Sequence, residues 1–183
     1  MVRCVSEHDQ LSENGDALTA LEPAHVAAFA AFSRAAEKTD LAVATAPRAA
    51  PHLSPSLNPR LARRVYAGEQ GTIYIVPGPG SLGSVSIAAG TGETVIGHTT
   101  TELAALDGLG HVGGRSGDGP VTFVGVLPAG GHDLRIINRA GRRIAIPLTR
   151  DDAYWVTVDD PADMLWTTAD GHDRQSPFGR FKL

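Results

Sequence analysis

Residues 121–158 read VTFVGVLPAGGHDLRIINRAGRRIAIPLTRDDAYWVTV, and this stretch decides the fold. It contains runs rich in β-branched and aromatic residues at 121–127, 132–138, 143–148 and 153–158, separated by proline, glycine and aspartate. The two central runs form a predicted hairpin, because Gly141 can take the positive φ of a tight turn. Alternation predicts that Leu134 and Ile136 face inward, and that Tyr154, Val156 and Val158 share one face of their strand.

Similar runs lie on both sides of this stretch, at 72–77, 85–88, 94–98 and 164–168. Strands at intervals of about ten residues, joined by short turns, are typical of antiparallel sheets. We therefore predict a mainly β (α+β) chain whose residues 68–172 form a small antiparallel β-sandwich or a partly closed barrel. Within this domain, Thr99 and Glu102 indicate a capping box for a helix at 100–107. The six glycines of 108–119 indicate a loop.

The preceding region has a different character. Pro23 suits a first helical turn, and Leu21, Phe29 and Phe32 recur at helical spacing, which predicts a helix over 23–38. Prolines 47, 51, 55 and 59 predict an extended arm over 40–59. Asn58 then predicts a capped short helix over 59–66. The expected organisation is an acidic tail (1–22), a helix with a Pro-rich arm and short helix (23–67), the β domain, and a C-terminal tail (173–183).

Composition excludes several classes of protein. The 183 residues include one cysteine, Cys4, so an internal disulfide and a cluster of thiolate ligands are excluded. The net charge of −4 does not indicate a uniformly basic nucleic-acid binder, and residues 69–119 carry five acidic against one basic side chain. No apolar run reaches 18 residues and no signal-peptide pattern is present, so a cytoplasmic protein is expected. An extracytoplasmic origin stays open if the true N-terminus lies upstream.

The predicted hairpin carries the strongest candidate contact surface, formed by Arg135, Arg139, Arg142 and Arg143. These cations could bind an acidic protein partner or, as a weaker hypothesis, nucleic acid. A nucleic-acid partner is not expected, because aromatic side chains do not interleave with the arginines. The alternative is a solvated sheet edge whose charges prevent pairing with other sheets.

Four histidines lie in or beside predicted loops: His98, His111, His132 and His172. A metal-dependent hydrolase would require them to converge, and their spacing matches no metal motif. Gly78, Gly80 and Gly83 match G-x-G-x-x-G, but a strand follows where a dinucleotide site needs a helix. We therefore expect no cofactor. The leading hypothesis is a non-enzymatic binding or structural module that acts through a surface patch or a sheet edge.

Five motifs also resemble an uncharacterised protein family of high-GC actinobacteria, across about residues 29–171. They are the segments FSRAA at 32–36, NPRLARRV at 58–65, YIVPGPGSL at 74–82, VGVLP at 124–128 and ADG at 169–171. The resemblance implies a mainly β domain and assigns no activity and no catalytic residue. Members of the family usually carry a membrane anchor and two central cysteines, whereas this sequence has no anchor and has Gly83 and Gly97 at about the cysteine positions.

Overall fold

The computed structural model describes residues 20–113 and 120–175, and these form a mainly β structure, as predicted. The strands form three antiparallel sheets and no closed barrel within these residues. The first sheet contains, in order, β1 (Arg63–Gly68), β2 (Gly71–Gly78), β3 (Ser81–Ala88) and β4 (Thr94–Thr100). The middle sheet contains β5 (Leu109–Gly113), β6 (Val121–Val126) and β9 (Ala153–Val158). The third sheet contains β11 (Asp173–Gln175), β10 (Pro161–Thr167), β7 (His132–Asn138) and β8 (Arg143–Ala145).

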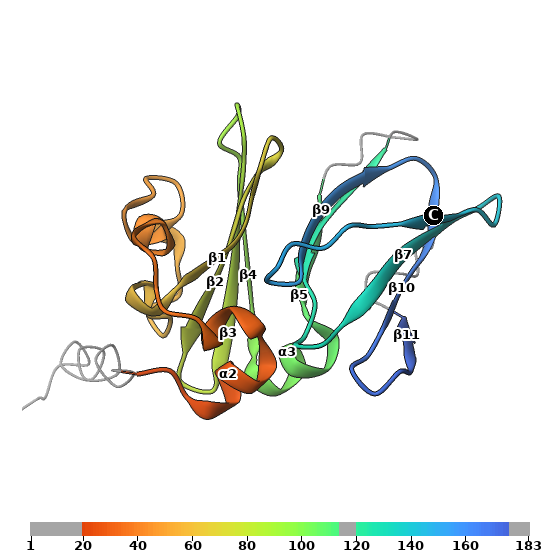
Figure 1. The fold of residues 1–183 in the computed structure, drawn as a ribbon. Helices are drawn as coiled ribbons and strands as arrows, with labels where there is room; N and C mark the ends of the chain where they lie inside the picture. Colours follow the sequence, from red (N-terminus) through yellow and green to blue (C-terminus); the bar gives the residue numbers. More distant parts are fainter. Residues whose placement is uncertain (1–19, 114–119, 176–183) are drawn as a thin grey trace, which may run out of the picture.

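The middle sheet is covered on both faces, because alternate side chains of β6 enter different cores. Val124 and Val126 pack with Ile73 and Ile75 of the first sheet. Val121 and Phe123 instead belong to a second core, with the third sheet. That second core contains Leu134, Ile136, Tyr154 and Val158, as the alternation predicted. Figure 1 shows the first sheet on one side of the molecule and the other two sheets on the other side.

The N-terminal helix is shorter than predicted. α2 spans Pro23–Ala28, Phe29 is extended (φ −140°, ψ 126°), and a 3-10 turn, η1, follows at Ala30–Ser33. The backbone amide of Ala129 donates to the Ala28 carbonyl at 2.9 Å. In a continued α-helix that carbonyl would accept from the Phe32 amide, which donates to Phe29 instead. A tertiary hydrogen bond therefore ends the helix, and the predicted helix over 23–38 is wrong beyond residue 28.

The Pro-rich arm covers the outer face of the first sheet. It contains two 3-10 helices, η2 (Lys38–Thr45) and η3 (Ala50–His52). Val43, Ala49 and Leu57 are buried in a third core, against Tyr74 and Val76 of β2. The sheet is therefore sandwiched between this arm and the middle sheet.

The predicted helix over 59–66 is also wrong. Asn58 does act as a cap, since its Oδ1 accepts from the Arg60 amide at 3.0 Å. The helical segment is only the 3-10 turn η4, Pro59–Leu61, because the following residues pair with β2 as β1. The β region consequently begins at Arg63 rather than at residue 68.

Two further segments predicted to lack secondary structure contain strands. Leu109–Gly113, placed in a loop by its glycines, forms β5, and residues 114–119 of that loop lie outside the described residues. Gly110 permits the pairing, because a Cβ there would lie 2.8 Å from the Val124 carbonyl. Asp173–Gln175, placed in the C-terminal tail, forms β11. Most of the predicted acidic tail, residues 1–19, also lies outside the described residues.

α3 (Thr101–Asp107) carries the chain from β4 of the first sheet to β5 of the middle sheet, at the lower end of the molecule in Figure 1. Its cap is Thr100, one residue later than predicted, and the Thr100 hydroxyl accepts from the Leu103 amide. No helix of the described residues has the length and apolar character to cross a membrane.

Candidate functional site

A crevice lies between the first and middle sheets, where β4 and β5 run along one flank. It consists of two cavities, of about 290 Å³ near α3 (the lower cavity) and about 260 Å³ near the β3–β4 turn (the upper cavity). Ser84, Gly97 and Leu109 line the lower cavity. Residues two positions along the same strands, Ser86, Val95 and His111, line the upper cavity. The two cavities are therefore neighbours along one wall.

Strand register explains which side chains face the crevice. Ser84 pairs with Gly97, and Ser86 pairs with Val95, so these four residues share one face of the first sheet. On the middle sheet, Val124 pairs with both His111 and Trp155, which places these three side chains in one row. The two faces meet, because Val124 also belongs to the core between the sheets.

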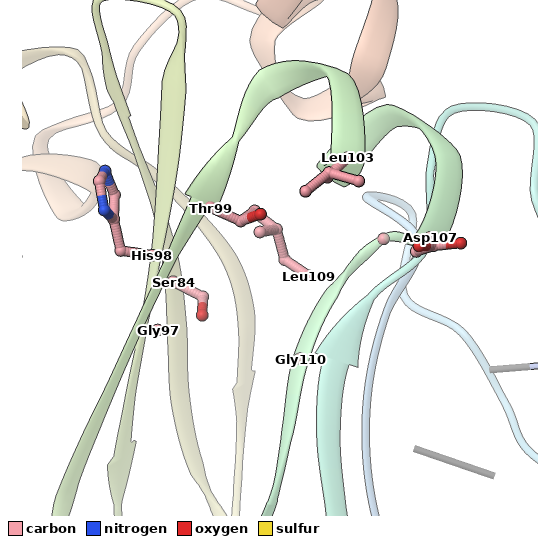
Figure 2. A pocket seen from close by; sticks show the side chains of 9 residues that line it. Ser84, Gly97, His98, Thr99, Leu103, Asp107, Leu109 and Gly110 are labelled. Carbon is pink, nitrogen blue, oxygen red and sulfur yellow. The ribbon is translucent and has the colours of Figure 1, made fainter. Parts of the chain in front are cut away.

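Gly97 leaves space in the wall of the lower cavity, because it has no side chain. A Cβ at Gly97 would come within 2.9 Å of Ser84 Oγ, so a larger residue would project into the cavity. Figure 2 shows Thr99 and Leu109 beside the space under α3, whereas the His98 imidazole points away from it. Leu103 of α3 also lines the cavity and is 51% exposed.

The upper cavity combines an indole ring with polar side chains. Trp155 is half-buried and lies beside the Tyr66 ring, with 5.9 Å between ring centroids. The Tyr66 hydroxyl donates to Gln70 Oε1 at 2.6 Å, and Gln70 also lines the cavity. The remaining polar lining residues are Ser86, Glu93, His111 and Thr122.

His111 is a neutral donor or acceptor in this cavity. Burial lowers the pKa of its imidazole, which keeps the ring uncharged at neutral pH. Its Nδ1 is buried and has no hydrogen-bond partner among the described residues.

The opposite flank of the two sheets is closed. There the Thr149 hydroxyl donates to the Val65 carbonyl of β1 at 3.0 Å. Arg34 binds Asp40 through two hydrogen bonds of 2.8 and 2.9 Å and lies 3.4 Å from Asp151, which precedes β9. β4 and β5, by contrast, are edge strands among the described sheets, and neither contains Lys, Arg, Asp or Glu.

Two of the four arginines in the predicted contact surface form ion pairs with aspartates. Arg135 forms an ion pair with Asp173, and Arg139 forms one with Asp160 at 3.0 Å. Arg142 and Arg143 are exposed at the hairpin turn and at β8.

The structure does not gather the four predicted histidines. His98 lies on the outer face of the first sheet and His111 in the crevice. His132 begins β7, and His172 lies in the β10–β11 turn. Across residues 20–113 and 120–175, no group of three or more His, Cys, Asp or Glu side chains is placed to hold a metal ion. The acidic residues Asp152 and Asp160 occupy turns with positive φ.

Most crevice residues were missed by the sequence analysis. Trp155 had a signal, because Tyr154 and Val158 were assigned to one face of their strand, which leaves Trp155 on the other. No comparable signal marked Glu93, Gln70 or Gly97. Polar residues in turns and single glycines in strands are too common to indicate a site. The chain matches no protein-family model, and no curated protein or solved structure is significantly similar to it.

Proposed function

We propose that this chain is a binding module that takes up an extended peptide segment of a partner protein along β4, with side chains of the segment in the crevice. The observation that supports this most directly is the open flank, where a groove runs between two uncharged edge strands. The opposite flank is closed by hydrogen bonds and ion pairs.

Strand addition uses backbone groups that an edge strand leaves available. Proteins normally protect exposed edges with charged residues, proline or a covering segment. The seven residues of β4 include no Lys, Arg, Asp or Glu and no proline. At about 3.3 Å per residue the strand is about 23 Å long. That length accommodates an extended segment of about six residues, in the mode by which peptides add to sheet edges.

The competing functions have less support. A metal-dependent hydrolase needs converging ligands, but His98 points from the outer face of the first sheet, whereas His111, on the middle sheet, lines the upper cavity. Contact with nucleic acid through the hairpin would depend on Arg142 and Arg143, because Arg135 and Arg139 are paired with carboxylates.

The test is selection of a displayed library of random decapeptides against the full chain, followed by amide NMR with an enriched peptide. We expect chemical-shift changes concentrated in Thr94–Thr100, with Gly97→Val weakening binding at least about tenfold by filling the groove. Ile96→Val is the matched control, because Ile96 pairs with Val85 on the outward face of the same strand and lines neither cavity. Absence of enriched peptides, shift changes elsewhere, or equal loss in both variants would contradict the proposal.

A further inference from the structure

We infer that the upper cavity is a subsite for a cationic side chain, lysine or arginine, of the bound segment. The inference rests on the proposed function and adds to it the chemical class of residue that the crevice selects. It depends on the indole of Trp155, the carboxylate of Glu93 and the absence of Lys and Arg among the described residues that line the cavity.

An aromatic ring and a carboxylate in one small cavity attract a cation in two ways. The face of an indole attracts a cation through its quadrupole, more strongly than the ring of tyrosine or phenylalanine does. Trp155 is held in place by Tyr66 on one side and by the backbone at Gly71, where a Cβ would come within 2.7 Å of the indole. The ring therefore lines the cavity in a fixed position, which lowers the entropic cost of binding.

Glu93 supplies the opposite charge from the β3–β4 turn. Its backbone is held on both sides, since its amide donates to Thr91 Oγ1 at 3.2 Å and its carbonyl accepts from the Ala88 amide at 2.8 Å. Its side chain is exposed, and no Lys or Arg of the described residues forms an ion pair with it. Arg48 reaches the same turn, but its guanidinium donates to the Thr91 carbonyl.

The other lining groups favour a cation or leave it undisturbed. Residues 69–113, which supply most of the cavity lining, contain four carboxylates and no Lys or Arg. The neutral imidazole of His111 does not repel a positive charge. Ser86 and Thr122 offer hydroxyl oxygens that can accept from an ammonium group.

The experiment compares N-acetyl-lysine methylamide with N-acetyl-norleucine methylamide, which has the same four side-chain carbons and lacks the terminal ammonium group. Binding is followed by NMR of the indole N–H of Trp155, with the buried Trp166 indole in the second core as an internal control. We expect the lysine probe to bind about fivefold more tightly than the norleucine probe. Glu93→Gln should reduce this preference, whereas replacing Glu102, an exposed glutamate on α3, by glutamine should leave it unchanged.

Equal affinity for the two probes, no Trp155 shift with either probe at tens of millimolar, or equal effects of the two glutamine variants would overturn the inference. These outcomes differ from failure of the proposed function. If library peptides bind β4 without enrichment of Lys or Arg, the crevice binds segments but the subsite does not select cations. If Gly97→Val leaves peptide binding intact while the lysine preference persists, strand addition fails and the cation subsite stands.

Discussion

Replacing Asp40 by asparagine should destabilise the chain strongly at neutral pH and less strongly in acid. The Asp40 side chain is fully buried. Its carboxylate accepts two hydrogen bonds from Arg34, one from the Glu37 amide at 2.6 Å and one from the Arg64 amide at 2.7 Å. Through these contacts it joins η2 of the arm to β1. Asparagine offers one acceptor oxygen and turns an N–H₂ group toward these donors, so Arg34 loses its nearest counter-charge and keeps only the more distant Asp151 and Glu37.

The pKa of Asp40 sets the size and the pH range of the effect. Burial raises this pKa, but the hydrogen bonds from Arg34 and from the Glu37 and Arg64 amides outweigh burial and lower it from 3.8 to about 2. The stabilisation is thus fully present above pH 3.8 and is lost as the pH falls through about 2. The shift corresponds to about 2.4 kcal/mol at pH 7 and about 1.3 kcal/mol at pH 3. Breaking the buried pair adds to this, so we expect a cost of about 3–5 kcal/mol at pH 7.

Urea denaturation, monitored by circular dichroism at pH 7 and at pH 3, measures the loss of unfolding free energy and its dependence on pH. Asp133→Asn is the control, because this aspartate is 73% exposed and its positive φ of 51° suits asparagine. The control should change the free energy of unfolding by less than about 0.5 kcal/mol. A cost for Asp40→Asn equal to that of the control, or one that does not shrink in acid, would refute the reasoning.

Three further predictions concern the cores and the crevice. Gly125→Ala places a Cβ 2.5 Å from the Tyr154 hydroxyl oxygen and 2.6 Å from the Leu109 carbonyl, so thermal unfolding should show a loss of about 1–3 kcal/mol. Phe123→Ala removes a ring that is 1% exposed in the second core and should cost about 3–5 kcal/mol by urea denaturation. Because burial lowers the pKa of His111, the folded state disfavours the imidazolium, and stability should fall as the pH drops below 6.5. His111→Gln should flatten the change in urea midpoint between about pH 7.5 and 5.5, and unchanged pH dependence would contradict this.

The strands were predictable where apolar residues alternate over a full run. Leu134 and Tyr154 lie in the second core because each belongs to such a run. The prediction failed where local signals favour a different element from the tertiary contacts. Asn58 begins a helical turn as its cap signal indicates, but pairing with β2 makes the next residues a strand. β5 was missed because glycines usually mark loops, whereas here Gly110 permits close contact with β6.

The candidate site was less predictable than the fold. The sequence analysis selected Arg135 and Arg139 as contact residues, but it could not show that both form ion pairs with aspartates distant in the sequence. The crevice combines Glu93, His111 and Trp155, which come from a turn and two strands spread over more than sixty residues. Only the packing of one sheet on another brings these side chains together, and no local pattern records that packing.

The order of strands has a consequence for how the chain assembles. β1 to β4 pair in succession, whereas β6 pairs with β9 and β7 with β10 across intervening strands. Short loops lose less entropy on closure than long ones, and local contacts accelerate folding. The N-terminal meander should therefore form early, and the interleaved C-terminal strands should condense onto its inner surface. The crevice then arises at the seam between an early-folding and a late-folding part of the chain.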